Sequence, residues 1–392
     1  MLCGSVRRNR NWRRRPVATG APGRAPRNIA FVCDGTLSSS APGERTNAGR
    51  LARLLREFGA STGQIARYDR GVQGRGWERW LNAATGRTIG LSIRAGYGFL
   101  ASRYRPGDRI FLFGYSRGGY AVRSLAGMIG RVGLLRAEAA TERRITEAYR
   151  LYESDAAPER LARFRELYCH PHTPIEMLGV WDTVRALGLP FPGFSWFSPM
   201  AVDFHDHALG HHIRHGYHAL AADETRLSYA PIKWERSEDW QGRLEQTWFP
   251  GDHADVGGEV RHRPEARGLS NIALNWMLRR AAAHGLALPE GWETRFPEDP
   301  GAPSSAGAGW LSRGFLIRAP RRTGGGDGES LHVSVQARMR RLCTRGRYTP
   351  RACATRVPIA RRALTRLAAA LPRRPLGAAP PPSAGHSPAQ LP

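Results

Sequence analysis

The sequence predicts an α/β fold with a largely parallel sheet. Along most of the chain, short apolar runs alternate with longer segments in which apolar residues recur at helical spacing. This alternation is typical of strand–helix–strand units, in which helices cover the faces of a parallel sheet. A glycine-flanked serine also stands between one apolar run and the helical segment after it, which marks the end of that strand as a candidate functional position.

The first half of the chain supplies three of the expected strands. The run NIAFVC ends in a D-G-T sequence, as a buried strand followed by a turn does, and P-G-D separates a helix from the run RIFLFG. In the helical segment 46–58, leucines stand at positions 51, 54 and 55, a helical spacing. In order, we expect a strand at 28–33, a helix at 46–58, a strand at 64–68, a helix at 91–104, a strand at 109–114 and a helix at 117–129.

The second half continues the alternation with longer interruptions. The run IEMLGVW predicts a strand at 175–181, and a weaker run predicts one near 246–249. Helices are expected at 142–152, 158–168, near 210–222, and at 270–283. Residues 185–210 and 285–330, rich in Pro, Gly and Trp, are interpreted as insertions over the active site.

One folded domain is expected between two basic ends. Residues 1–27 have no apolar period and predict a disordered arm, residues 28–352 a catalytic domain, and residues 353–392 a basic, then Pro/Ala-rich tail that is largely disordered. The net charge is +26, and arginines in residues 1–30 and 331–392 supply 20 of these charges with no acidic residue beside them. Such ends favour peripheral contact with an anionic membrane over specific nucleic-acid recognition.

The remaining composition bears on the compartment. No apolar stretch is long enough for a transmembrane helix, and the N-terminus lacks the apolar segment of a secretory signal. The five cysteines show no C-x-x-C spacing, which favours reduced thiols. We therefore expect a protein that is cytoplasmic when made.

The sequence Gly114-Tyr115-Ser116-Arg117-Gly118 fits the pattern G-x-S-x-G. In α/β-hydrolases this pattern lies between a strand and a helix, where the glycines allow a sharp turn that exposes the serine hydroxyl. Here Ser116 would be the nucleophile, and the amide of Arg117 would face the developing oxyanion at the helix N-terminus. The competing interpretation is an ordinary glycine-rich turn of a nucleotide-binding fold.

A serine nucleophile needs a base and an acid that orients the base. In α/β-hydrolases both follow the serine in the chain, beyond later strands. Asp182 stands at the end of the expected strand 175–181, and His253 follows the run Trp248-Phe249-Pro250, so we assign them as acid and base. Asp206 and Asp255 are the alternative acids.

Two other motifs suggest different chemistry. His211, His215 and His218 would share one face of the helix expected near 210–222, but no carboxylate stands at a ligand spacing, so packing or solvation is favoured over a metal site. Asp34-Gly35-Thr36 resembles the first motif of haloacid-dehalogenase-type phosphatases, whose nucleophile would fall on Val32. The phosphatase interpretation therefore lacks a nucleophile. In a hydrolase, the backbone amides of Gly35 and Thr36 are instead candidates for the second oxyanion donor.

Ordered motifs across residues 29–350 resemble the bacterial α/β-hydrolase domain family typified by type VI secretion phospholipase effectors. They are FVCDGTL, YDRGV, GDRIFLFGYSRGGYAVRSLAGMI, LGVWDTV, HALAADETR, WFPGDHADVGG, GLSNIALNWML and LHVSVQARM. The resemblance places the family's catalytic residues on Ser116, Asp182 and His253. The chain departs from the family at Gly119, where alanine is usual. Its length implies that the large membrane-binding module of some members is absent or reduced.

Together these features predict a serine hydrolase that cleaves acyl esters without a metal or organic cofactor. The resemblance implies phospholipid substrates, export by a type VI system without a signal peptide, and secretion machinery or an immunity protein as partners. Small esters are the alternative substrates, which would make the protein a carboxylesterase. The alternative of another class is a catalytically inactive module whose basic ends bind anionic partners.

Overall fold

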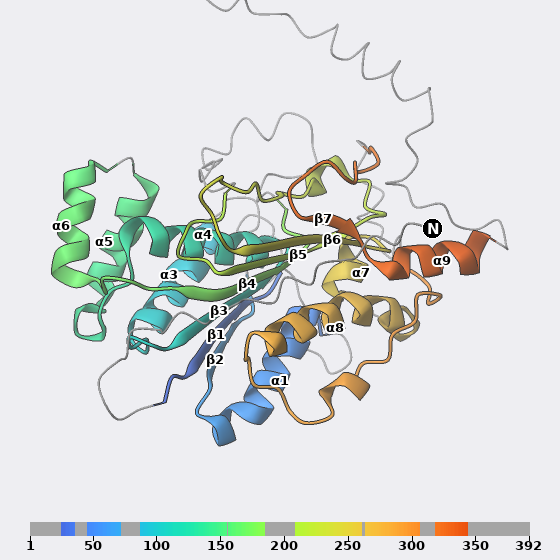
Figure 1. Ribbon diagram of the computed structural model, residues 1–392, viewed down its shortest axis with the longest axis horizontal. Coiled ribbons are helices and arrows are strands. Elements are labelled where there is room, and N and C mark those ends of the chain that lie inside the picture. The colour runs from blue at the N-terminus through green and yellow to red at the C-terminus, as the bar shows by residue number, and fades with distance from the viewer. Residues whose placement is uncertain are drawn as a thin grey trace, which may run out of the picture. The chain divides into compact units, whose positions relative to one another are not determined.

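The computed structural model describes residues 25–35, 45–71, 87–154, 156–184, 208–260, 263–305 and 318–343. In these residues the chain forms a seven-stranded sheet in which all neighbouring strands are parallel, in the order β2-β1-β3-β4-β5-β6-β7 (Figure 1). The strands are β1 (Asn28–Cys33), β2 (Ile65–Asp69), β3 (Arg109–Tyr115), β4 (Ile175–Trp181), β5 (His215–Ala221), β6 (Arg243–Phe249) and β7 (Glu329–Leu331). The predicted fold class, α/β-hydrolase-like with a parallel sheet flanked by helices, is confirmed.

Helices cover both faces of the sheet, with α3 and α4 on one face and α1 and α8 on the other (Figure 1). The helices are α1 (Asn47–Thr62), α3 (Arg87–Ala101), α4 (Arg117–Val132), α5 (Glu142–Glu153), α6 (Pro158–Tyr168), α7 (His253–Gly257), α8 (Arg267–Ala283) and α9 (Val333–Cys343). Within the described residues, no helix combines the length and the apolar character needed to cross a membrane.

The strand residues divide between two hydrophobic clusters because successive side chains of a strand point to opposite faces. In β1, Ile29, Phe31 and Cys33 join the cluster that contains residues of α3, α4 and α5, whereas Ala30 and Val32 join the cluster formed with α1 and α8. All five are essentially inaccessible to solvent. This two-sided burial explains why the strands read as continuous apolar runs.

The strand order places a switch point between β1 and β3. The chain leaves β1 to form β2 on one side, then crosses back to form β3 on the other side of β1. In open parallel sheets, ligands bind beyond the carboxyl ends of the strands at such a point. The end of β3 is Tyr115, so the structure places the glycine-flanked serine directly at the switch point.

The expected helix near 210–222 is wrong, because these residues include β5, which lies between β4 and β6. A central strand buried on both faces lacks the alternation that distinguishes a strand from a helix in sequence. His211, His215 and His218 therefore do not share a helical face. The structure also shows β7 and α9, which the sequence pattern did not predict. β7 has three residues and begins at the end of the segment 285–330 that was interpreted as an insertion.

Most of both predicted tails, and residues 185–207, lie outside the described residues. The proposed disorder of 1–27 and 353–392, and the insertion at 185–210, stay predictions.

Candidate active site

Ser116 lies in a strained turn between β3 and α4. Its backbone has φ 56° and ψ −121°, a positive φ that is uncommon for residues other than glycine, and its amide donates to the carbonyl of Trp181 at 3.0 Å. A strained turn that joins a strand to a helix is the geometry in which a nucleophilic serine is presented in α/β-hydrolases.

The flanking glycines allow this turn because backbone segments approach each other there too closely for a side chain. A Cβ on Gly118 would lie 2.3 Å from the carbonyl oxygen of Cys33, and a Cβ on Gly114 would lie 2.4 Å from the carbonyl oxygen of Gly118. Gly119 is also confined: a Cβ there would lie 2.4 Å from Thr183 Oγ1, which gives a packing reason for glycine at a position where the family usually has alanine.

Gly118→Ala is expected to lower the free energy of unfolding by about 2 kcal/mol or more, because the obstructing atoms are backbone and cannot rotate away. Thermal and denaturant unfolding measure this change. Gly49→Ala in α1 is the control, since its Cβ would meet no atom closer than 3.4 Å and alanine favours helices. Equal stability of the Gly118 variant and the wild type would contradict the close approach of α4 to β1.

His253 is the first residue of α7, directly after the loop that leaves β6. Asp252 caps this helix, and its carboxylate accepts the amides of Ala254 and Asp255 at 3.0 and 3.1 Å. The buried imidazole places Nε2 2.8 Å from Ser116 Oγ. This is the distance at which an imidazole can take a hydroxyl proton.

Two aromatic rings hold the imidazole of His253. The ring centroids of Tyr115 and Tyr229 lie 5.0 and 4.8 Å from it. Tyr115 leaves no room beside it, because a Cβ on Gly257 would lie 1.9 Å from its ring. The ring of His253 is therefore positioned by packing as well as by hydrogen bonds.

Asp182 completes the hydrogen-bonded chain from the end of β4. Its Oδ2 lies 2.6 Å from His253 Nδ1, and its Oδ1 accepts the amide of Ala221 at 3.0 Å. The residue is fully buried and has a positive φ of 39°. Side chains from the carboxyl ends of β3, β4 and β6 thus meet at one edge of the sheet, in the arrangement Ser–His–Asp.

Arg321, which was not predicted from the sequence, binds the same aspartate. Its guanidinium donates to Asp182 Oδ1 at 2.5 Å and Oδ2 at 2.9 Å, and to the carbonyls of Ala221 (2.9 Å) and Tyr229. Burial alone would raise the pKa of Asp182, but the charge of Arg321 and the contact with His253 hold it well below its ordinary value. Arg321 lies 139 residues after Asp182 in the sequence, beyond a Pro/Gly-rich stretch. No rule of sequence spacing links the two residues.

The Asp34–Gly35 turn lies beside the serine, since a Cβ on Gly35 would be 3.5 Å from Ser116 Cβ. The Asp34 carboxylate accepts the hydroxyls of Thr46 (2.6 Å) and Tyr68 (2.5 Å) and the amide of Gly35 (2.7 Å). Burial raises the pKa of Asp34 to about 6, although these hydrogen bonds lower it in part. The carboxylate therefore holds the turn in place, and the Gly35 amide is engaged with it. Thr36 lies outside the described residues.

Of the two alternative acids, Asp255 is engaged with other groups and is not hydrogen-bonded to His253. Asp255 accepts hydrogen bonds from the amide of Asp252 and from Ser304 and Ser305, so it anchors the segment near 305 to α7. Asp206 lies outside the described residues. For the phosphatase interpretation, Val32 is fully buried in β1 and supplies no nucleophile.

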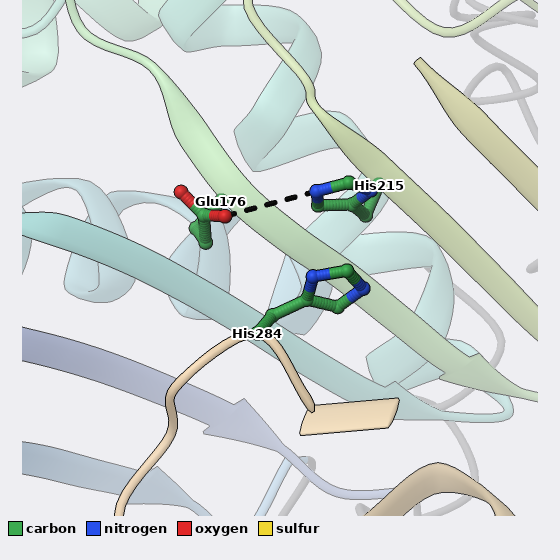
Figure 2. Close-up of side chains that lie close together, drawn as sticks. All are labelled: Glu176, His215 and His284. Atoms are coloured by element: carbon green, nitrogen blue, oxygen red, sulfur yellow. Dashed lines mark ion pairs between the residues drawn. The ribbon is translucent and has the colours of Figure 1, made fainter. Parts of the chain in front are cut away.

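A candidate metal cluster lies at the opposite edge of the sheet, where β4 and β5 begin and α8 ends. Glu176, His215 and His284 offer ligand atoms within 4.8 Å of one another (Figure 2). The two imidazoles are stacked, with centroids 3.7 Å apart and planes at 16°, so their in-plane lone pairs run nearly parallel and do not meet at one point. Arg214 also neutralises Glu176 at 2.8 Å.

Hydrogen bonding and charge favour a packing role for this cluster. His284 Nε2 is hydrogen-bonded to the hydroxyl of Tyr217 at 2.7 Å. Burial, together with His284 and Arg214, lowers the pKa of His215 to about 4, which keeps the stacked pair from sharing like charges. The cluster could hold an ion only after the rings rotate, so we interpret it as a packed histidine pair.

The parallel α/β sheet and the Ser–His–Asp chain at its carboxyl edge define the architecture of a hydrolase-type α/β domain. The family model described as "T6SS, Phospholipase effector Tle1-like, catalytic domain" matches residues 27–280. The chain therefore belongs to the Tle1-like catalytic domain family of type VI secretion phospholipase effectors.

Individual relatives match more distantly. An uncharacterized protein of Saccharomyces cerevisiae, YEL023C, is 29% identical over 212 residues, which cover 47% of this chain and 31% of that protein. A crystal structure of an uncharacterized protein from Pseudomonas aeruginosa is 18% identical, with a TM-score of 0.39, over 70% of this chain and 49% of that one. The structure of the Tle1 effector bound to the VgrG spike is 16% identical, with a TM-score of 0.27, over 59% and 51%. The chain thus spans at most about half the length of these relatives.

Proposed function

We propose that this protein is a serine-dependent acyl-ester hydrolase that acts on phospholipids. The observation that carries the proposal is the continuous chain from Ser116 Oγ through the His253 ring to Asp182, with distances of 2.8 and 2.6 Å. This chain can activate a hydroxyl that is otherwise a poor nucleophile near neutral pH. Membership of a phospholipase effector family supports the lipid substrate.

In the proposed mechanism, Ser116 Oγ attacks the ester carbonyl while His253 Nε2 takes its proton. Asp182 stabilises the resulting imidazolium through Nδ1. Collapse of the tetrahedral intermediate breaks the bond to the leaving alcohol, which receives the proton from His253. Water then repeats these steps on the acyl-enzyme, with His253 as base, to release the carboxylic acid and restore Ser116.

The developing oxyanion requires donors close to Ser116. The amide of Arg117 stands in the first turn of α4, where the helix dipole favours negative charge. The turn at Asp34–Gly35 lies beside Ser116, which supports it as the source of a second donor. The Gly35 amide would have to release Asp34 to do so, which makes the amide of Thr36 its competitor for this role.

Substrate class is tested by comparing phosphatidylglycerol vesicles with short soluble esters, using the wild type and Ser116→Ala. We expect the wild type to release fatty acid from vesicles and to hydrolyse soluble esters, and the variant to do neither. Turnover of soluble esters with intact vesicles would identify a carboxylesterase. Unchanged turnover in Ser116→Ala would refute the serine mechanism.

The partners proposed for this chain follow from its family. We propose secretion machinery of the type VI system, or an immunity protein, as protein partners, and export without a cleaved signal. The Tle1 effector has been captured on a VgrG spike, which supports a test with a spike protein. Co-purification of the full chain with a cognate spike is the expected result, and failure to bind any spike encoded beside its gene would contradict it.

A further inference from the structure

A charged cleft lies outside the candidate active site, between the first half of α1 and the segment after the short helix Trp292–Thr294. We call it the arginine cleft. It has a volume of about 270 Å³ and is lined by Arg45, Arg50, Arg53, Leu54, Glu57, Arg295 and Phe296. Leu54 and Phe296 are buried and give the cleft an apolar floor, and the Arg50 guanidinium lies 5.7 Å from the centre of the Phe296 ring. Residues 50, 53 and 57 share one face of α1 because of helical spacing.

The charges in the arginine cleft are not balanced. Arg295 pairs with Glu57 at 2.6 Å, but Arg45, Arg50 and Arg53 have no carboxylate partner among the described residues. The Nε of Arg50 is buried without a hydrogen-bond acceptor in the same part of the chain. Burial lowers the pKa of Arg50, and repulsion by Arg45 and Arg53 lowers it further.

The arginine cleft brings together guanidiniums that lack a paired carboxylate within the described part of the chain. Two exposed arginines of neighbouring elements are paired with acids, Arg279 with Glu298 at 2.8 Å and Arg341 with Asp299 at 2.7 Å, whereas three of the arginines that line the cleft are not. Three adjacent guanidiniums without a counter-ion repel one another, and a bound anion would offset that repulsion.

We propose that the arginine cleft is a binding site for a phosphate monoester or anionic phosphodiester group. Guanidinium forks pair with phosphate oxygens through two parallel hydrogen bonds. A phosphate monoester offers three terminal oxygens for the forks to share, and a phosphodiester offers two terminal oxygens that share one negative charge. The partly buried position of Arg50 over an apolar floor strengthens such contacts because water screens them less.

The cleft borders the elements that carry the Ser–His–Asp chain. Arg45 precedes Thr46, whose hydroxyl donates to Asp34 beside Ser116. Arg267 joins the carbonyl of Arg45 (2.7 Å) to that of Gly258 (2.5 Å), at the end of the helix that carries His253. The phosphate group bound in the cleft can belong to a lipid head group at a membrane or to a free phosphorylated molecule. Binding of either one requires no catalysis.

The test compares two doubly substituted full-length chains that lose equal charge. Arg50→Gln/Arg53→Gln removes two guanidiniums from the cleft, and Arg56→Gln/Arg163→Gln removes two exposed guanidiniums that do not line it. Calorimetric titration with inorganic phosphate in about 0.15 M salt measures affinity under physiological screening. Unfolding curves and circular dichroism verify that all chains are folded.

We expect saturable binding to the wild type, unchanged binding to the Arg56/Arg163 control, and about tenfold or greater weakening for each cleft arginine removed. Co-sedimentation with phosphatidylglycerol and phosphatidylcholine vesicles identifies the source: the same variant pattern on phosphatidylglycerol alone, without binding of free phosphate, assigns a lipid head group. The proposal would be overturned if both double variants lost affinity equally, or if the cleft variant lost none. It would also be overturned if the wild type bound neither inorganic phosphate nor vesicles. None of these results depends on hydrolysis, so they are independent of the proposed function.

Discussion

Asp182→Asn is expected to lower kcat for acyl-ester hydrolysis about ten-thousandfold, as loss of a correctly placed triad acid does. An amide cannot stabilise the imidazolium that forms when His253 takes the serine proton. It also leaves the buried guanidinium of Arg321 without its carboxylate. Steady-state kinetics with a soluble ester, on protein shown to be folded, measure the loss.

Asp255→Asn is the matched control, because it makes the same chemical change in a buried aspartate of α7. Its carboxylate contacts Ser304 and Ser305 and not His253, so we expect a lower melting temperature with most of the activity retained. An inactive Asp255 variant beside an active Asp182 variant would show that the acid has been assigned to the wrong residue.

Arg321→Met is expected to move the acidic limb of the kcat/KM profile to higher pH by about one unit, since a nearby charge shifts a pKa by one unit or more. Arg321 places a positive charge beside the carboxylate of Asp182, which stabilises the imidazolium. Removing that charge favours the protonated imidazole, so more of the base is lost at a given acidic pH.

Stability changes separate this tuning from a structural role. Breaking a buried ion pair from one side costs about 3–5 kcal/mol, so the variant is expected to unfold more easily at neutral pH. Because Arg321 helps to hold the pKa of Asp182 below its ordinary value of 3.8, the pair stabilises the fold fully above about pH 4. The difference in the free energy of unfolding between the wild type and the variant should become smaller as the pH falls further and Asp182 becomes protonated.

Two further variants complete the test of Arg321. Arg321→Lys keeps the positive charge without the two-pronged contact, and should retain the wild-type pH profile with reduced stability. Arg318→Met removes a charge from the same segment, where the side chain contacts Thr225 and not Asp182, and should leave the pH profile unchanged. If kcat/KM of Arg321→Met were lower at every pH, with no shift of the acidic limb, Arg321 would have only a structural role.

The sequence was sufficient to predict the strands that carry the candidate site. The runs before Ser116 and Asp182 are buried on both faces of the sheet, and such strands appear as compact apolar runs with clear ends. Parallel strands bring their carboxyl ends to one edge, so residues that follow them are drawn together even when they lie 71 or 137 residues apart. This geometric rule made the proximity of Ser116, His253 and Asp182 predictable.

The errors have equally physical causes. β5 carries polar His215 and His218 within an apolar run, and its pattern fits a helix as well as a central strand. β7 is too short to produce a periodic signal. His218 is fully buried, and its Nε2 accepts the amide of Thr183 at 3.2 Å, a packing role that no spacing reveals.

Arg321 was unpredictable for another reason. Its role depends on the return of an irregular segment to the carboxyl edge of the sheet, where it also places the Ala319 amide on the carbonyl of Thr225. In a chain with 58 arginines, one arginine beside another in a Gly/Pro-rich stretch carries no distinguishing signal. Only the three-dimensional contact with Asp182 identifies it.

Labelling by a fluorophosphonate probe tests the central claim most directly, because such probes react only with an activated serine. We predict that the folded wild-type chain is labelled near neutral pH and that both Ser116→Ala and His253→Ala lose the label. Labelling that persists in Ser116→Ala, or a folded wild-type chain that remains unlabelled in the presence of phospholipid vesicles, would contradict it.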